Sequence, residues 1–242
     1  IKHWQQAEIA SGLGEYTVYN HTNLLTSIFA HAVKFYGLRQ NPCILAGNIK
    51  CPPKEMNFLT IDEFKQLIDD PEQMPRNTII IKILFWTGIR ISECLALTVG
   101  DIESGRIHVC KNNVRVGKEY IIQEQIKNNR SRYVKINPTL ERDILKYINH
   151  LYGHTKDTVL FPITRATVNA AVNKSCEHTG VKRIRVHDLR HSHVALLIHM
   201  GYFPKAIADR IGDSVNTVLK TYAHIYEEDE AKMINELEEM AL

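Results

Sequence analysis

The sequence predicts a mainly α-helical protein with one small antiparallel β-sheet, an α+β fold. Most of the 242 residues lie in stretches with apolar side chains at helical spacing. One central section, residues 105–136, contains short runs rich in Ile, Val and Tyr around an Asn-rich turn, which is typical of paired strands. Hydrophobic residues make up 44% of the chain, enough to bury a core, and charged residues 24%.

The first part of the chain predicts a helical unit followed by a linker. Residues 19–37 place apolar side chains at helical spacing, and Gly37 is a stop signal. Two prolines interrupt the stretch at 51–57, and Thr60 and Glu63 then form a capping box that opens a new helix. We therefore expect four parts: a helical unit at 1–50, a linker at 51–57, a larger domain at 58–226 and an acidic helix at 227–242.

The larger domain is expected to contain helices on both sides of the β section. The apolar run at 78–88 predicts a buried helix that ends at Gly88, and Ser92 is the expected N-cap of a short helix. Three strands are expected, at residues 105–110, 119–126 and 131–136. The last two are expected to form a hairpin around a turn at 127–130. Further helices are expected near 139–151, 166–179, 187–200, 204–211, 214–224 and 230–241.

The charges are distributed unevenly along the chain. The last sixteen residues, 227–242, carry seven acidic side chains and one lysine, a net charge of −6. Because the whole chain has a net charge of +3, the preceding residues carry +9. A basic body of this kind is either an ordinary solvated surface or a face that binds a polyanion.

Several classes of protein are disfavoured by composition. The five cysteines are scattered and contain no C-x-x-C pair, so neither a disulfide framework nor a structural zinc is expected. No apolar run is long enough to span a bilayer, and the chain opens without a signal-peptide pattern. We expect a cytoplasmic protein with no membrane partner.

The stretch "IRVHDLRHSH" at residues 184–193 concentrates three histidines and two arginines around one aspartate. On a helix, His187 and His191 share a face, and Asp188 stands where the zinc motif H-E-x-x-H has its glutamate. A third ligand is not evident, so no metal is expected. Arg190 lies beside His187 at i+3, an arrangement that suits an oxyanion, whereas His193 is expected on the packed side of the helix.

Three other stretches supply residues of matching chemistry. They are "TGIRISECLAL" with Arg90, "QIKNNRSRYV" with Lys127, and "IGDSVNTVLKTYAHIY" with Tyr222. Together with "HDLRHSH", and in this order, they resemble the tyrosine recombinases, or phage integrase family, most of all the integrases of Gram-positive phages and integrative conjugative elements. The resemblance covers nearly all of residues 58–226. It implies the catalytic fold of that family, preceded at 1–50 by part of a helical core-binding domain.

The resemblance implies a site-specific DNA recombinase, or integrase, that cleaves and rejoins strands through a 3′-phosphotyrosyl intermediate without metal, ATP or other cofactor. It implies the catalytic set Arg90, Lys127, His187, Arg190 and Tyr222. Tyr222 would be the nucleophile, the arginines would bind the phosphate, His187 would take up the phenol proton and Lys127 would donate a proton to the leaving oxygen. Among nearby residues, Glu93 is interpreted as structural and His191 as supporting at most.

Asp213 departs from the family pattern, because it occupies the position of a second histidine or a tryptophan. An ionised carboxylate donates no hydrogen bond and repels a phosphate. We expect Asp213 to cap the helix that begins near Ser214. Either activity is lowered as a result, or a nearby group such as His224 supplies the missing donor; the sequence leaves both open.

The expected partner is double-stranded DNA. The candidates for phosphate contacts are Arg130, Arg132, Lys182, Arg183 and Arg185. The family resemblance also implies a homotetramer on DNA, in which the helix at 227–242 is exchanged between protomers, with accessory DNA-bending or excision factors as further partners. Three alternatives stay open: a catalytically weak or inactive DNA-binding remnant, a metal-dependent nuclease that uses His187 and His191, and a relaxase similar to type IB topoisomerases.

Overall fold

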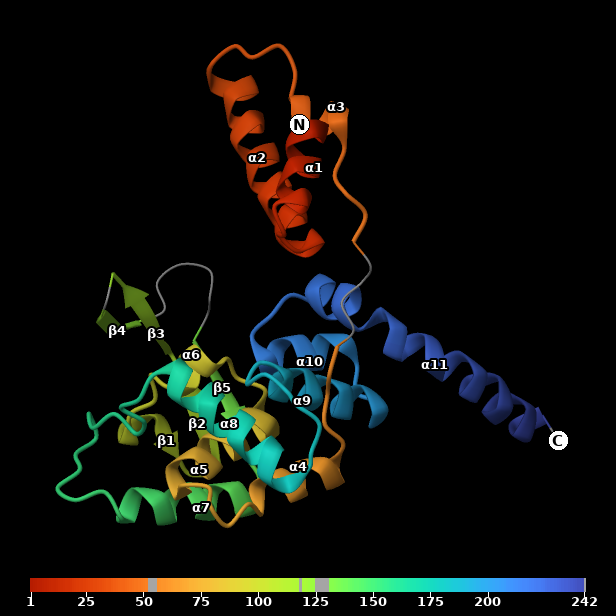
Figure 1. Cartoon of the computed structure of the whole chain (residues 1–242). Helices are drawn as coiled ribbons and strands as arrows, with labels where there is room; N and C mark the ends of the chain where they lie inside the picture. Colours follow the sequence, from red (N-terminus) through yellow and green to blue (C-terminus); the bar gives the residue numbers. More distant parts are fainter. Residues whose placement is uncertain (52–55, 118, 125–130, 242) are drawn as a thin grey trace. The chain divides into compact units, whose positions relative to one another are not determined.

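A computed structural model describes residues 1–51, 56–117, 119–124 and 131–241 (Figure 1). The chain divides into two compact units, Ile1–Glu55 and Met56–Leu242. Both are mainly helical, and the second also contains two small antiparallel sheets, so the predicted fold class is confirmed.

Within the described part of the chain, no helix combines the length and apolarity that a membrane span requires.

In its described residues, the first unit has three helices, α1 (Lys2–Ala10), α2 (Glu15–Phe35) and α3 (Pro42–Ala46). A buried glutamine joins them: Gln5 donates to Thr22 Oγ1 at 3.2 Å and to the carbonyl of Gly47 at 3.1 Å. The helix predicted at 19–37 begins earlier, at Glu15, whose carboxylate in the first turn interacts favourably with the helix dipole.

The second unit has eight helices in its described residues, some of them short. They are α4 (Ile61–Ile68), α5 (Pro75–Thr87), α6 (Ile91–Cys94), α7 (Pro138–Asn149), α8 (Arg165–Thr179), α9 (Asp188–His199), α10 (Pro204–Ile211) and α11 (Val215–Ala241). The predicted capping box is present, since Thr60 and Glu63 bond reciprocally at the start of α4. The two helices expected at 214–224 and 230–241 form one element, α11, whose backbone leaves helical geometry at Tyr222.

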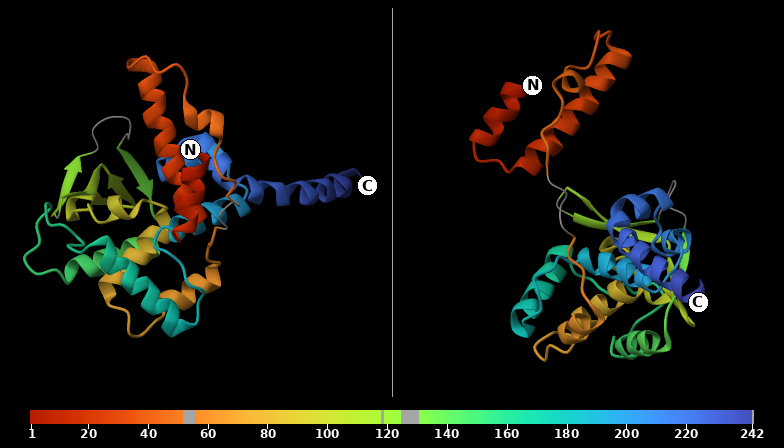
Figure 2. Two further views of the ribbon diagram at one scale, coloured as in Figure 1. Left: turned by 45° about the horizontal axis from the view of Figure 1, so that its top comes forward. Right: turned by 90° about the vertical axis from the view of Figure 1, so that its right-hand side faces the viewer.

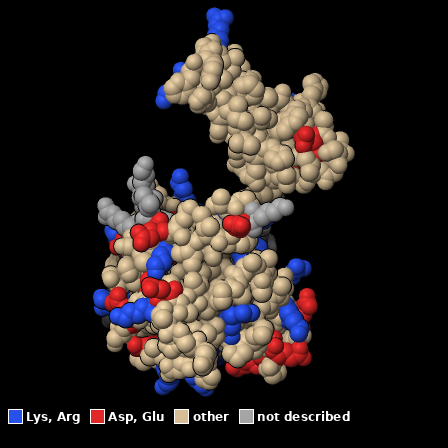
Figure 3. Space-filling view, turned by 90° about the vertical axis from the view of Figure 1, so that its left-hand side faces the viewer, with Lys and Arg blue, Asp and Glu red and all other residues tan. Residues whose placement is uncertain are grey.

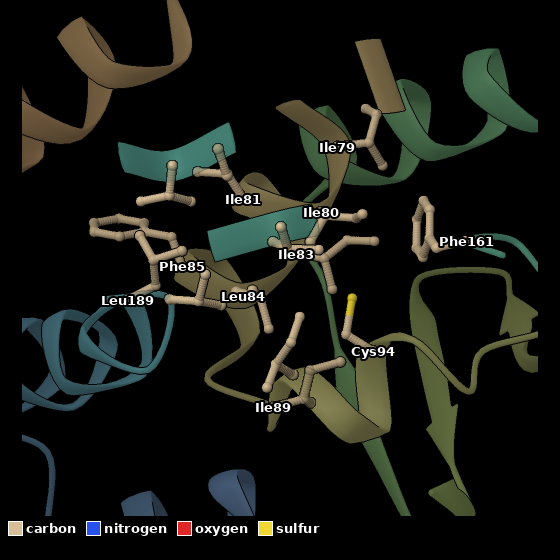
Figure 4. Packing of buried hydrophobic residues seen from close by; sticks show 14 of the residues in the cluster. Ile79, Ile80, Ile81, Ile83, Leu84, Phe85, Ile89, Cys94, Phe161 and Leu189 are labelled. Carbon is tan, nitrogen blue, oxygen red and sulfur yellow. The ribbon is translucent and has the colours of Figure 1, made fainter. Parts of the chain in front are cut away.

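The core of this unit is built around α5, which is buried on nearly every side. Its side chains Ile80, Ile81, Ile83 and Phe85 are fully buried, and Leu189 of α9 packs against them (Figure 4). α5 ends at Gly88 in the left-handed conformation, as the sequence predicted. α9 contacts α5, α10 and α11, so the helix that carries the "HDLRHSH" motif is held by the core on one side and by the C-terminal helices on the other.

The sheet pairing differs from the prediction. The strands are β1 (Ile102–Glu103), β2 (Arg106–Val109), β3 (Lys111–Val116), β4 (Glu119–Glu124) and β5 (Arg132–Lys135), and a short 3₁₀ helix, η1 (Val99–Asp101), precedes β1. β4 does not pair with β5: it pairs with β3, while β5 pairs with β2. The buried pair Ile107 and Val134 draws β5 onto the core sheet, and the polar strand β3 gave no apolar pattern to detect. The expected turn at 127–130 lies outside the described residues.

The expected N-cap at Ser92 is also wrong. α6 begins at Ile91, so Ser92 lies inside the helix, and Arg90 occupies the capping position. The carboxylate of Glu93 accepts a hydrogen bond from the Arg90 backbone N–H at 2.8 Å. The start of α6 is therefore closed by a glutamate, which fixes the backbone of Arg90.

Gly88 is expected to tolerate no side chain. A Cβ there would lie 2.6 Å from His193 Cδ2 and 3.0 Å from Ile211 Cγ2, at a φ of +67°. Gly88→Ala should lower the free energy of unfolding by about 2–4 kcal/mol, because overpacking adds to left-handed strain. Gly153, with φ +62° and nothing within 4 Å of its Cβ position, is the matched control. Gly153→Ala should cost only about 1 kcal/mol in urea unfolding, and equal losses would contradict the steric explanation.

Candidate active site

Arg190 is a buried arginine fixed by the ends of two helices. Its side chain is 5% exposed and projects from α9. Nη1 donates to the carbonyl of Gly88 at 2.6 Å, after the end of α5, and to that of Ile211 at 2.8 Å, at the end of α10. These carbonyls have no partner within their own helices and carry the negative end of the helix dipole, so they stabilise the guanidinium.

Arg90 reaches the same place from the turn after α5. Its Nη2 donates to the carbonyl of Gly212 at 3.2 Å, and the side chain is 29% exposed. Asp213 joins the two arginines: its Oδ2 lies 2.6 Å from Nη2 of Arg190 and 3.2 Å from Nη2 of Arg90. Two arginines from distant parts of the sequence thus converge on one carboxylate oxygen, as they would on an oxygen of a phosphate.

The expected capping role of Asp213 is therefore wrong. The first-turn N–H of Thr217 donates to Ser214 Oγ at 3.0 Å, so Ser214 caps α11. The local sequence could not reveal that two guanidinium groups lie beside Asp213, and their attraction for the carboxylate exceeds that of the helix N-terminus. The side chain of His224, the other residue considered for the missing donor, lies outside the described residues.

Glu93 is a buried carboxylate that holds Arg90 in place. Its side chain is 1% exposed and accepts a bidentate pair of hydrogen bonds from Arg132, at 3.0 and 2.8 Å, and a further one from Arg90 Nη1 at 3.3 Å. Burial works against its charge, but the hydrogen bonds and charges of Arg132 and Arg90 outweigh it and hold the pKa of Glu93 below its usual value. The glutamate thus keeps two arginines in place.

Tyr222 lies against α9 at the break in α11, with φ −118° and ψ 18°. The residue is 4% exposed, and its hydroxyl is 2.7 Å from Nδ1 of His191. His187 lies one turn before His191, with the two rings perpendicular and their centroids 4.8 Å apart. The sequence predicts that His187 takes up the phenol proton and that His191 has a supporting role at most. In the structure, the hydrogen bond to the phenol is made by His191.

The environment keeps the tyrosine protonated and the histidines neutral. Burial raises the pKa of the Tyr222 phenol. Burial, followed by the charge of His187, lowers the pKa of His191 to about 4, and burial and the charge of Arg190 lower the pKa of His187. At neutral pH the phenol is therefore protonated and both imidazoles are neutral, so Nδ1 of His191 can accept the phenol proton in the tautomer that carries the ring proton on Nε2.

The other predicted residues are placed as follows. Arg132, expected to contact DNA, is instead 11% exposed and bound to Glu93, because β5 turns it toward the core of the site. Lys182 pairs with Glu63 at 3.0 Å and Arg185 with Asp188 at 2.6 Å, while Arg183 is exposed. Lys127 and Arg130 lie outside the described residues.

One supporting residue was missed from the sequence. Arg210, near the end of α10, donates from Nε to His193 Nε2 at 3.0 Å and from Nη2 to the carbonyl of Trp86 at 2.9 Å. His193 is 3% exposed, so its prediction as a packed residue is confirmed. The only available signal for Arg210 was a basic residue in the last turn of a helix, which is common on any surface.

Potential metal ligands gather elsewhere. Within the part of the chain that the structure describes, one group of three lies close enough together, formed by Asp101, His108 and Cys110. The ammonium of Lys111 is 2.8 Å from Asp101 Oδ2, so a cation from the protein already neutralises this carboxylate. His187 and His191 belong to no such group among the described residues.

The family model of the phage integrases matches residues 57–229, which include Arg90, Arg190 and Tyr222. The chain belongs to the phage integrase family. The ICEBs1 integrase of Bacillus subtilis is 30% identical over 250 residues, covering 95% of this chain and 67% of that protein. The tyrosine recombinase XerH of Campylobacter jejuni is 28% identical, covering 73% of this chain and 50% of the relative.

The fold agrees with this assignment. The Tn1549 transposon integrase, solved in complex with transposon right end DNA, has a TM-score of 0.78 over 97% of this chain and 83% of that one, at 22% identity. The predictions of family, of catalytic fold and of a tyrosine-type site-specific recombinase are therefore confirmed.

The burial of His191 predicts a loss of stability in acid. The pKa of His191 is near 4 in the folded protein and 6.5 in the unfolded one, so the unfolded state takes up the proton first and is favoured as the pH falls from 6.5 to 4. After allowance for solvent screening, we expect this histidine to account for about 1–2 kcal/mol.

His191→Asn should remove that contribution while an amide oxygen still accepts from Tyr222. Urea unfolding of both proteins between pH 7 and pH 4 measures it, with the wild type losing more. Parallel curves for the two proteins would show that His191 does not titrate in this way.

Proposed function

We propose that this recombinase cleaves and rejoins DNA through a covalent 3′-phosphotyrosyl bond to Tyr222, and that one chain supplies both the nucleophile and the arginines. The observation that carries the proposal is the 2.7 Å hydrogen bond between the Tyr222 hydroxyl and Nδ1 of His191, the residue next to Arg190 on α9. It brings the phenol to the helix that carries Arg190. Arg190 and Arg90 together form the proposed phosphate-binding pair, here called the phosphate cradle.

The chemistry needs no outside energy source. The Tyr222 hydroxyl passes its proton to His191, its oxygen bonds to phosphorus, and the bond from phosphorus to the 5′-oxygen breaks. Arg90 and Arg190 donate to the non-bridging oxygens, where negative charge grows in the transition state. Lys127 is proposed to protonate the departing 5′-oxygen, which gives a 5′-hydroxyl. Attack by another 5′-hydroxyl on the phosphotyrosine reverses these steps and joins a new strand.

Double-stranded DNA is the proposed partner. Support comes from solved relatives described as complexes with DNA, including the Tn1549 integrase and XerH on its difH substrate. On the face of the molecule shown in Figure 3, basic and acidic side chains are interspersed and form no continuous basic field. We propose that phosphate contacts come from exposed basic side chains such as Arg183, and that residues 1–50 contribute as part of a core-binding domain.

The second half of α11 is proposed to pack on a neighbouring protomer of a tetramer. It extends beyond the body of its unit (Figure 2, left) and carries an exposed apolar stripe: Ile234 is 57% exposed, Leu237 56% and Met240 83%. Between α9 and α10 a groove is lined by apolar side chains such as Met200 and Tyr202, together with Arg210. An apolar stripe flanked by glutamates complements a groove of this composition.

Removal of the phenol oxygen should abolish covalent chemistry. On a nicked suicide duplex the wild type is expected to form a detergent-stable protein–DNA adduct, and Tyr222→Phe none, although its DNA affinity should stay within about twofold because Phe keeps the packing. Denaturing gel electrophoresis measures the adduct. An adduct that persists in Tyr222→Phe would refute the assignment, retained binding without a wild-type adduct would indicate a remnant, and strand cleavage that leaves no adduct and is lost with a chelator would indicate a metal-dependent nuclease.

A charge in the stripe of α11 should weaken assembly and leave binding intact. Leu237→Asp is expected to lower the formation of the tetrameric complex on a full-site duplex by about tenfold or more, since a carboxylate is costly to bury in an apolar groove. Analytical ultracentrifugation with labelled DNA measures both species. The control, Glu239→Gln, changes a charge on the same helix; if both variants assemble as the wild type does, the stripe does not contact a neighbour.

A further inference from the structure

We propose that Asp213 is a positioning residue that holds Arg90 and Arg190 in the arrangement used for the scissile phosphate and competes with that phosphate for them. This inference rests on the proposed function, because it takes the two arginines as the phosphate cradle. Its starting point is the carboxylate oxygen at 2.6 Å from Arg190 and 3.2 Å from Arg90.

The arginines have anchors that do not depend on Asp213. Arg190 Nη1 is held by the carbonyls of Gly88 and Ile211, and Arg90 Nη2 by that of Gly212. The carbonyls fix the direction of each guanidinium but carry no full negative charge. Asp213 supplies that charge, and a phosphate oxygen offers the same chemistry at the same donors. The two anions therefore exclude each other, and the cradle keeps its shape when one replaces the other.

The backbone around Asp213 allows this replacement. Its side chain is 26% exposed, whereas that of Arg190 is 5% exposed, so the carboxylate is the accessible member of the pair. Asp213 lies in the short connection between α10 and α11, directly after Gly212 with φ +69° and directly before Ser214, the cap of α11. Movement of Asp213 away from the arginines thus acts on the first turn of the helix that carries Tyr222.

A different role for Asp213, as the base that takes the phenol proton, fits the contacts less well. The Tyr222 hydroxyl bonds to His191, and the Asp213 oxygen that is in contact faces the guanidinium groups. The two roles predict opposite outcomes on removal of the charge. Loss of a competitor strengthens phosphate binding, whereas loss of a base slows cleavage and leaves phosphate binding as it was.

The test uses Asp213→Asn, which keeps the size of the side chain and removes its charge. Asp209→Asn is the matched control, since Asp209 is also an aspartate of this region but pairs with Lys205 on the exposed surface of α10. The thermal unfolding midpoint of each full-length protein is followed while inorganic phosphate is added. Phosphate should raise the midpoint of Asp213→Asn clearly more than that of the wild type or of Asp209→Asn. Equal responses in all three proteins would overturn the proposal.

DNA supplies a second measurement. With the nicked duplex, Asp213→Asn should bind about tenfold more tightly than the wild type and form its adduct at least as fast, because the competing charge has gone. Weaker or unchanged binding, or slower adduct formation at saturating DNA, would also overturn the proposal. If Asp213→Asn does not fold, Asp213→His, which brings a donor instead of a negative charge, replaces it in the phosphate titration. Phosphate should again raise its unfolding midpoint more than that of the wild type, and an equal response would overturn the proposal.

The phosphate titration involves no cleavage, so the two proposals fail separately. A wild type that forms no adduct while Asp213→Asn responds to phosphate removes the proposed function and leaves the competition intact. A wild-type adduct that requires Tyr222, together with an Asp213→Asn that behaves as the wild type, leaves the function intact and removes the competition.

Discussion

The catalytic unit depends on a buried positive charge. The side chain of Arg190 is only 5% exposed, and two chain segments, the end of α5 and residues 211–213, meet at its guanidinium because each supplies groups that balance the charge. The end of α5 and the end of α10 supply carbonyls, and the residue after Gly212 supplies a carboxylate. Burying an unpaired charge is prohibitively costly, so the segments that form the site are also segments that the fold cannot release independently.

A second group of charged residues, Glu93 and Arg132, holds Arg90 and the chain around it in place. Glu93, itself buried, ties Arg90 to Arg132 and closes the start of α6 through the Arg90 backbone. Arg132 packs so closely on Gly212 that a Cβ there would lie 2.5 Å from its Nη1. The strand β5, the helix α6 and the connection before α11 are thereby joined through side chains, so the sheet supports the geometry of the site.

The sequence predicted those features that depend on local chemistry. Gly88 ends α5, Thr60 and Glu63 cap α4, and the histidine-rich motif lies on a helix, because each is decided within a few residues. Features that depend on residues far apart in the sequence were not predicted. The pairing of β5 with β2 follows from two buried side chains, and one of the two partners of Asp213, Arg90, lies 123 residues earlier in the chain.

The sequence named several residues that the structure places at the candidate site, but not their contacts. Arg90, Arg190 and Tyr222 could be named from their motifs, since the residue types and their order are specific. Their hydrogen-bond partners could not. His191 rather than His187 contacts the phenol because of how α11 packs on α9. Arg132 binds the buried Glu93 instead of remaining exposed because β5 turns it toward the core. Periodicity carries no information about either choice.

The interruption of α11 at Tyr222 has a mechanical meaning. In a straight helix the direction of the last turns would be tied rigidly to the Tyr222 ring, and any movement of the acidic tail would move that ring as well. With the break at the tyrosine itself, the tail can bend about that joint while the turns before it stay docked on α9 and α10. Tyr222, the proposed nucleophile, thus lies at the joint between the docked turns of α11 and its C-terminal turns.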